Sequence, residues 1–203
     1  MAGTGRGGSK RRTAAETRER VLGVARDLFY WDGIRATGVD RVASEAGVAP
    51  TTLYRLFASK DDLVAAYVER EDRHFREWFD TAVEVGGPDP RGRILAVFDA
   101  LAEQVRPERC RGCPFQMALA EFPDTDLPAR RNAVANKAWV RERLGGLTDE
   151  LAKGEPGGDP FALADELALL VEGVYASAQS SDAVRAAARA RALVEGLLAA
   201  PER

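Results

Sequence analysis

Apolar residues recur every three to four positions along almost the whole chain of 203 residues, which is the spacing of one face of an α-helix. No stretch combines strict apolar–polar alternation with β-branched residues, so strands are not expected. Runs rich in Gly, Pro and Asp, such as GGPDP at 86–90 and EPGGDP at 155–160, separate the helical segments. The pattern therefore predicts an all-α protein of about nine helices.

Residues with known positional preferences mark the ends of these helices. Gly33 suits the C-terminus of the first helix, because glycine tolerates the backbone that ends many helices. Thr37, with Asp40 three residues later, suits the N-cap of the second helix, and Ser59 suits the N-cap of the fourth. The predicted helices cover about 14–30, 38–46, 50–57, 60–85, 91–106, 114–122, 127–153, 161–180 and 183–200.

The charge of the chain changes sign along its length. Residues 1–60 contain 11 Lys and Arg against 6 Asp and Glu, whereas residues 61–203 contain 18 against 26. A basic segment attracts phosphates, and an acidic one is repelled by them. Together with the motif at 37–60 described next, this asymmetry predicts a disordered basic arm at 1–13, a DNA-binding domain at 14–59 and a larger helical domain at 60–203.

Residues 37–60, TGVDRVASEAGVAPTTLYRLFASK, carry the most specific pattern in the chain. Two short helical segments meet at the turn from Glu45 to Val48, where Gly47 allows a tight backbone turn. The second segment begins with Pro50 and small polar residues, and it carries an aromatic residue and a cation. This is the arrangement of a helix-turn-helix, whose second helix enters the major groove of DNA.

The segment GVARDLFYWDGIRATGVDRVASEAGVAPTTLYRLFASKDDL resembles the DNA-binding domain of TetR/AcrR-type transcriptional regulators, and the match spans about residues 14–65. Leu56 departs from the pattern, because relatives often have His there, so no phosphate contact is expected from this position. The resemblance implies an N-terminal helix-turn-helix domain followed by a helical domain for ligand binding and dimerisation. The matching positions are Gly33, Thr37, Val42, Ala43, Ala46, Gly47, Val48, Leu53, Tyr54, Phe57 and Lys60.

The chemistry of the second helix indicates which side chains contact DNA. Hydroxyl, phenol and guanidinium groups on a helix in the major groove can reach base edges and phosphates. We expect Thr51, Thr52 and Arg55 to approach bases. Tyr54 and Lys60 are expected to hold phosphates.

Two earlier positions and the basic arm extend the expected DNA contacts. Thr37 lies at a helix N-terminus, where it either contacts a phosphate or only caps the helix. Arg41 is expected to reach a base or the DNA backbone. The arm either supplements these contacts or serves only as a solubilising tail. Its basic residues near the domain are Lys10, Arg11 and Arg12.

The resemblance also implies a ligand cavity among the fourth to seventh helices. Aromatic residues at helical spacing fit the walls of such a cavity, although the same pattern forms an ordinary core. Gln116 and Glu121 flank this apolar set and could orient a polar group of a ligand, whereas His74 is expected on a solvated face. The candidate walls are Phe75, Trp78, Phe79, Phe98, Phe115, Met117, Phe122 and Trp139.

The last two helices are the candidate dimer interface. One has a wide apolar surface and the other is rich in small residues that allow close approach of a second helix. Either both helices close the core of the monomer, or they form a four-helix interface, which the family resemblance favours. The residues concerned are Leu163, Leu167, Leu170, Val171, Val174, Tyr175, Leu193 and Leu197.

The two cysteines, Cys110 and Cys113, permit competing interpretations. Zinc requires about four ligands, and two cysteines with the distant His74 do not supply them. A thiol switch would need a lowered pKa, which Arg109, Arg111 or a helix N-terminus could provide. The favoured interpretation is a packed, structural Cys113, because GCPF followed by ALAEFPD resembles a segment that recurs in one subgroup of these regulators.

These observations predict a homodimeric, ligand-responsive transcriptional regulator. We expect a repressor that leaves its palindromic operator DNA when a small, largely apolar or aromatic effector binds. The sequence contains no Ser/His/Asp set or phosphate loop, so neither an enzymatic activity nor a cofactor or metal is expected. The alternatives are a redox-sensing regulator that uses its cysteines, and a small-molecule-binding helical protein with a vestigial DNA domain. Without a signal peptide or a membrane span, a cytoplasmic protein is expected.

Overall fold

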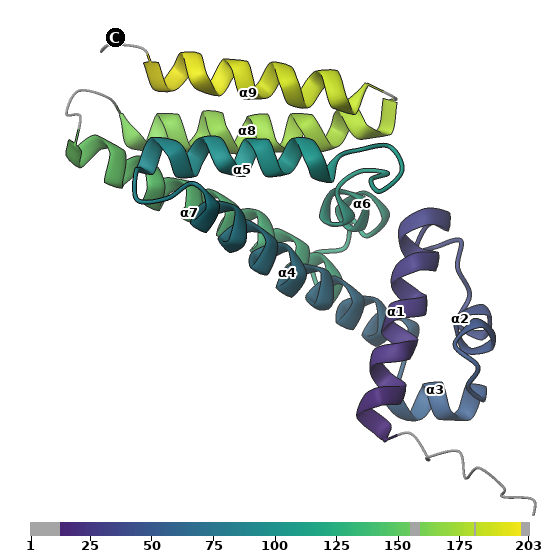
Figure 1. The fold of residues 1–203 in the computed structure, drawn as a ribbon. Helices are drawn as coiled ribbons and strands as arrows, with labels where there is room; N and C mark the ends of the chain where they lie inside the picture. The colour runs from purple at the N-terminus through teal and green to yellow at the C-terminus, as the bar shows by residue number, and fades with distance from the viewer. Residues whose placement is uncertain (1–12, 155–158, 181, 200–203) are drawn as a thin grey trace, which may run out of the picture. The chain divides into compact units, whose positions relative to one another are not determined.

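The computed structural model describes residues 13–154, 159–180 and 182–199. Within these residues the secondary structure is helical, without strands, which confirms the predicted fold class (Figure 1). The α-helices are α1 (Ala14–Asp32), α2 (Val39–Glu45), α3 (Pro50–Leu56), α4 (Lys60–Val85), α5 (Pro90–Gln104), α6 (Pro114–Glu121), α7 (Pro128–Gly154), α8 (Pro160–Ser177) and α9 (Ala183–Ala199), with the 3₁₀ turn η1 (Ala178–Ser180) after α8.

Most helix ends lie close to the predicted positions, but the start of α2 does not follow the predicted capping. Gly38, and not Thr37, is the N-cap of α2, and it makes no side-chain cap hydrogen bond. Ser59 does cap α4, since its Oγ accepts a hydrogen bond from the backbone N–H of Asp62 at 3.0 Å. A cap that the pattern did not predict is Thr13, which forms a complete capping box with Glu16 at the start of α1.

The chain divides into two compact units, one up to Leu63 and one from Val64 onward, so the boundary falls inside the first turn of α4. The first unit is a three-helix bundle in which α1 packs on both α2 and α3. Its core is apolar, and its fully buried residues come from all three helices. They include Val21, Leu22, Ala25, Phe29, Val42, Ala43 and Leu53.

The turn between α2 and α3 depends on Gly47. Its φ of +60° lies in the left-handed region, which is strained for residues with a Cβ atom. The N–H groups of Gly47 and Val48 donate to the carbonyls of Ser44 and Ala43, each at 3.0 Å. These hydrogen bonds close the turn of the helix-turn-helix and set the direction in which α3 leaves it.

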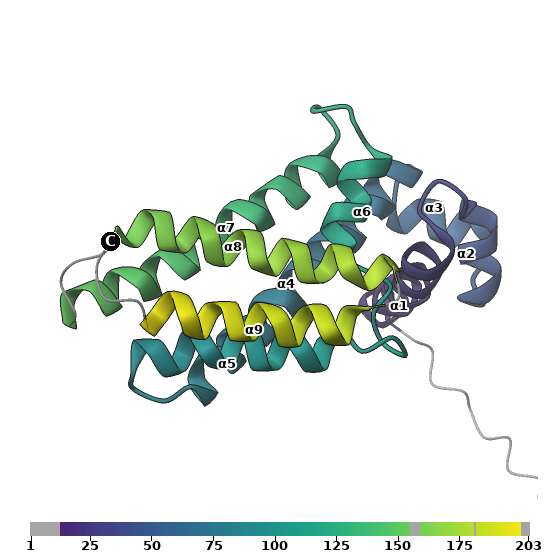
Figure 2. The same ribbon diagram turned by 90° about the horizontal axis from the view of Figure 1, so that it is seen from above.

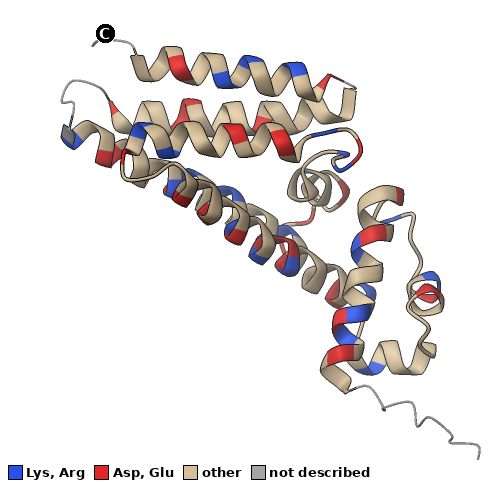
Figure 3. Ribbon diagram, viewed as in Figure 1, with Lys and Arg blue, Asp and Glu red and all other residues tan. Residues whose placement is uncertain are grey.

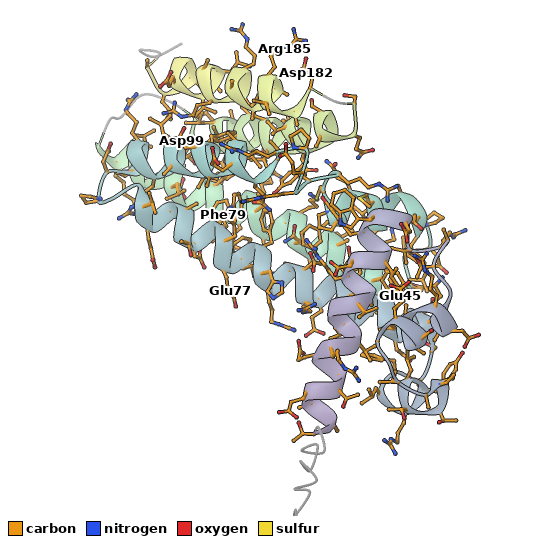
Figure 4. The ribbon with its side chains drawn as sticks, turned by 45° about the vertical axis from the view of Figure 1, so that its right-hand side comes forward. Glu45, Glu77, Phe79, Asp99, Asp182 and Arg185 are labelled. Carbon is orange, nitrogen blue, oxygen red and sulfur yellow. The ribbon has the colours of Figure 1, made fainter. Side chains whose placement is uncertain are left out.

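The second unit is a larger helical bundle. Helix α8 packs on α7 and α9, α5 packs on α7 and α9, and α6 packs on α7, so that α5, α8 and α9 run side by side (Figures 1 and 2). The part of α4 in this unit is tied to α7 by polar contacts. On α4, Phe79 is buried in the unit, whereas Glu77 points outward (Figure 4).

Candidate functional site

Helix α3 presents a polar face to the outside of the first unit. Thr51, Tyr54 and Arg55 are exposed, Tyr54 to 51%, and Thr52 is half-buried. The opposite face is anchored by Leu53, which is fully buried. The four residues predicted to contact DNA from this helix therefore share one outward face, and the apolar anchor holds that face in a fixed orientation.

Phe57, directly after α3, fixes the end of the helix. It is buried, and its backbone N–H donates to the carbonyl of Leu53 at 2.9 Å. The guanidinium carbon of Arg18 on α1 lies 5.0 Å from the centre of the Phe57 ring, within the range of a cation–π contact. This contact joins the end of α3 to α1.

The Thr37 side chain points into the first unit. It is fully buried, and its hydroxyl donates to the carbonyl oxygens of Gly33 at 2.8 Å and Leu28 at 3.4 Å. Thr37 thus ties the loop after α1 to the C-terminal end of that helix. Its hydroxyl is not available to a phosphate in this arrangement.

Arg41 and Lys60, the two other predicted DNA contacts, are both engaged within the unit. Arg41 on α2 forms ion pairs with Asp32 at 2.8 Å and Glu45 at 3.0 Å. Lys60 Nζ donates to the backbone carbonyl of Arg35 at 3.3 Å. The Arg41 side chain is exposed and that of Lys60 is half-buried. The basic arm, with Lys10, Arg11 and Arg12, lies outside the described residues.

In the second unit, five of the predicted wall residues form one aromatic cluster. The rings of Phe75 and Trp78 lie 5.2 Å apart between centroids, Phe75 and Phe115 lie 5.8 Å apart edge to face, and Phe79 and Trp139 lie 5.4 Å apart. The cluster joins α4, α6 and α7. Such a cluster forms an apolar body against which a ligand could pack, and it also serves as core.

The other residues considered for the ligand site differ in burial and in their contacts. Phe98 is buried on α5. Phe122 is the buried C-cap of α6, and the carbonyl of Phe122 accepts a hydrogen bond from Arg130 at 3.1 Å. Gln116 donates to the Glu172 carboxylate at 2.6 Å. Glu121 is half-buried, and His74 is exposed as expected for a solvated face.

A polar seam between α4 and α7 was not predicted. Asn136 is fully buried and donates to Asp72 at 2.8 Å, and Arg143 donates to Asp80 at 2.7 Å. Figure 3 shows Lys and Arg interspersed with Asp and Glu along both helices. The signal available in the sequence was the spacing of polar residues along 127–153, but it does not say which helix they face.

The cysteines are both buried at the start of α6. Cys113 is the N-cap of α6 and only 1% exposed, and burial raises the pKa of its thiol above the ordinary value of 9.0. Lys137 opposes this rise but does not outweigh it. The effect predicted for a thiol switch, a lowered pKa, is therefore absent at Cys113. Cys110 is 6% exposed, and its Sγ lies 3.7 Å from the carbonyl oxygen of Gly112.

Helices α8 and α9 bury part of the predicted dimer surface in their own unit. Four of the predicted residues, Leu167, Val171, Val174 and Tyr175, are buried within the chain, and three, Leu163, Leu170 and Leu197, are half-buried. Leu193 is exposed. The strongly exposed apolar residues that the prediction did not name are Phe161, Leu169 and Val184.

None of the helices in the described residues combines the length and the apolar character needed to cross a membrane. Nor does the described part of the chain bring together three or more His, Cys, Asp or Glu side chains in a group that could hold a metal ion.

An exposed polar helix on a small three-helix bundle, joined to a larger helical unit, defines a helix-turn-helix transcriptional regulator. Comparison with known families agrees at both ends of the chain. The family described as "Bacterial regulatory proteins, tetR family" matches residues 21–67, and the "Tetracyclin repressor-like, C-terminal domain" matches residues 90–194. The chain belongs to the TetR family of transcriptional regulators.

Individual relatives support this assignment. The chain is 27% identical over 146 residues to the HTH-type transcriptional repressor KstR2 of Mycolicibacterium smegmatis, covering 66% of this chain and 67% of that protein. It is 26% identical over 156 residues to the HTH-type transcriptional regulator YjdC of Escherichia coli, covering 77% and 80%. The crystal structure of SCO4454, a TetR-family regulator from Streptomyces coelicolor, is similar with a TM-score of 0.83 and 34% identity, covering 91% and 95%.

Proposed function

We propose that the protein is a homodimeric repressor that binds a palindromic operator and releases it when a small molecule binds to the second unit. The observation that carries this proposal is the outward polar face of α3, with Thr51, Thr52, Tyr54 and Arg55 above a buried anchor. Arg55 and the two hydroxyls suit base edges, and Tyr54 suits a phosphate. Lys60 and Arg41 are further cations of the first unit that we include in the DNA contacts, and Thr37 supports the unit by its hydrogen bond at the end of α1.

Dimerisation follows from the size of one recognition helix. One such helix reads few base pairs, so a specific site requires two, which lie about 34 Å apart on successive major grooves. Helices α8 and α9 offer an exposed surface of small and apolar residues suited to a four-helix interface. This surface consists of Ala162, Leu169, Gly173 and Ala176 on α8 and Val184, Ala188, Ala192, Leu193 and Gly196 on α9.

The effector site is assigned to the aromatic cluster of Phe75, Trp78, Phe79, Phe115 and Trp139, and the buried Phe98 and Phe122 are included as further walls. A small molecule with an apolar or aromatic body packs against such side chains. Helix α4 supplies three of these rings and starts at Lys60, next to the recognition helix. An effector that binds better when α4 is displaced shifts the equilibrium toward the form that releases DNA.

A selection of genomic fragments tests the proposal. The full-length protein is incubated with sheared genomic DNA from the source cells, and the retained fragments are sequenced. We expect a palindromic motif, and we expect Arg55→Ala and Tyr54→Phe each to weaken binding to it. Arg73→Ala is the matched control, because Arg73 is an exposed arginine on α4 in the second unit.

Two results would contradict the proposal. If wild type retains no fragment above background, the protein has a vestigial DNA domain, which was the alternative from the sequence. If Arg55→Ala and Arg73→Ala behave alike, α3 does not read the DNA. The redox alternative gains no support from the structure, because the thiol of Cys113 is buried and its pKa is raised.

A further inference from the structure

Lys137, in the middle of α7, holds a cation inside the second unit. Its Nζ donates to Oε1 of Glu172 on α8 at 2.7 Å and lies 3.1 Å from Sγ of Cys113 at the start of α6. The ammonium also lies 5.7 Å from the centre of the Phe115 ring. Side chains of three helices therefore meet around one charge.

The carboxylate of Glu172 is held at both of its oxygens. Gln116 Nε2 donates to Oε2 at 2.6 Å and also lies 3.3 Å from the backbone carbonyl oxygen of Glu172. The two donors come from α6 and α7, while the carboxylate comes from α8. The side chain of Glu172 is 34% exposed and that of Lys137 is 22% exposed, so Glu172 is the more solvent-accessible partner of the pair.

Stability alone is a weak explanation for charges at this position. Removing two charges from water costs about as much as their attraction returns, and apolar residues of similar volume often replace such a pair without loss. Burial lowers the pKa of Lys137, but that pKa still lies above its usual value, because the adjacent carboxylate of Glu172 favours the charged ammonium. The lysine is therefore a persistent cation, and recognition of an anion is the role to which it is suited.

The surroundings of this cation define what kind of anion fits. Phe115, under the ammonium, packs edge to face on Phe75, which in turn contacts Trp78. A continuous path of aromatic side chains thus leads away from the Lys137 charge. A ligand that contacts both the Lys137 ammonium and the aromatic side chains has one anionic head group and an apolar body.

We propose that Lys137 and Gln116 bind the carboxylate of an amphipathic effector, an aromatic or aliphatic carboxylic acid, in exchange for the carboxylate of Glu172. This inference rests on the proposed function, because it assigns the chemical class of the effector. The exchange supplies one carboxylate for another at the same two donors, so it leaves no buried charge unpaired. The side chain of Glu172 then turns to water, and α8 loses its polar ties to Lys137 and Gln116.

The exchange predicts that removing the internal carboxylate opens the site to an external one. The test uses the full-length Glu172→Ala protein with propionate, phenylacetate and the uncharged phenylacetamide as probes, measured by calorimetry and thermal unfolding. We expect phenylacetate to bind Glu172→Ala at least tenfold more tightly than it binds wild type, which must first release Glu172. We also expect Glu172→Ala to bind phenylacetate at least tenfold more tightly than it binds phenylacetamide. Propionate should raise the melting temperature of Glu172→Ala.

Two further variants connect the binding to the named donors. In Lys137→Met/Glu172→Ala the preference for phenylacetate over phenylacetamide should disappear. Glu166→Ala, an exposed glutamate on the same helix, is the matched control and should bind phenylacetate as wild type does. If Glu172→Ala does not fold, Glu172→Gln replaces it, because the amide keeps the size of the side chain and removes its charge.

The outcomes separate this inference from the proposed function. Equal binding of phenylacetate and phenylacetamide to Glu172→Ala, or an unchanged preference after removal of Lys137, overturns the inference. Operator binding by wild type in the absence of probe is measured in parallel. If operator binding is present and the carboxylate preference is absent, only the effector class is wrong. If the carboxylate preference is present and operator binding is absent, the proposed function is wrong.

Discussion

Asn136 on α7 donates a hydrogen bond from Nδ2 to Oδ1 of Asp72 on α4 at 2.8 Å, from a fully buried side chain. The second oxygen of Asp72 accepts a hydrogen bond from Arg76 Nε at 2.7 Å. Arg76 also lies 4.7 Å over the ring of Trp139. A polar link between α4 and α7 therefore adjoins the aromatic cluster that we assign to the effector.

Asp72→Ala should destabilise the second unit by about 1–3 kcal/mol, because it leaves the buried amide of Asn136 without its acceptor. Urea unfolding followed by circular dichroism measures the change. Asp80→Ala is the control, since Asp80 and its partner Arg143 are about half exposed and such surface pairs contribute at most about 1 kcal/mol. Equal losses in the two variants would show that burial of Asn136 adds nothing to the link.

The sequence predicted the first unit more completely than the second because the signals there are local. Gly33, Gly47 and Ser59 act on their own backbone or on neighbours a few residues away, so their roles can be read from position. Lys137 and Glu172 are 35 residues apart, and their contact depends on how α7 and α8 pack. No pattern along a single helix contains that information.

The dimer residues show a second limit of the sequence. Helix α8 is apolar on most of its circumference, so the spacing of its apolar residues does not reveal which face packs against the rest of the second unit. In the structure Leu167 and Val171 are buried, whereas Leu169 is exposed.

Thr37 shows the same limit in the first unit. It was predicted to cap α2, but its hydroxyl donates a hydrogen bond to the carbonyl of Gly33 at the end of α1, because the loop between the two helices brings it there.

Gly47→Ala should destabilise the first unit by about 1–2 kcal/mol, because the left-handed backbone at this position is unfavourable for a residue with a Cβ atom. The new atom would also lie 3.3 Å from Nη1 of Arg20. Gly38→Ala is the matched control, since nothing lies within 4 Å of a Cβ there and its φ is −78°. Thermal unfolding and operator affinity report the difference. A loss in Gly38→Ala as large as in Gly47→Ala would contradict the argument.

Glu45→Gln should raise operator affinity. The substitution removes one negative charge beside the recognition helix and frees the Arg41 guanidinium from one of its two ion pairs. We expect tightening of about threefold to tenfold at low salt, shrinking as added salt screens the charges. Fluorescence anisotropy with a labelled operator measures it at two salt concentrations. The control is Glu69→Gln, which makes the same change in the exposed pair of Glu69 with Arg73 on α4 and should have little effect on operator affinity. Equal tightening in the two variants would show that only the net charge of the protein matters.

Gly173→Leu should abolish dimerisation while leaving the monomer folded. Gly173 is exposed on α8, and nothing in the chain lies within 4 Å of a Cβ placed there. Leucine also favours the helix by about 1 kcal/mol relative to glycine, so the monomer itself is not weakened. Sedimentation velocity should show a monomer and a lower operator affinity. The control is Gly145→Leu on α7, where a Cβ also meets nothing, and this variant should remain a dimer. A stable dimer of Gly173→Leu would show that the interface lies elsewhere.

Stability should fall between pH 8 and pH 10 because of Cys113. Burial raises the pKa of its thiol in the native state above the ordinary value of 9.0, while the unfolded chain keeps the ordinary value. The contribution is fully present below that value and is lost as pH rises toward the native pKa, because only the unfolded state releases the proton readily. The free energy of unfolding in urea at pH 8, 9 and 10 should decrease more steeply for wild type and Cys110→Ala than for Cys113→Ala. Parallel curves for all three proteins would show that the Cys113 thiol does not titrate differently in the folded and unfolded states.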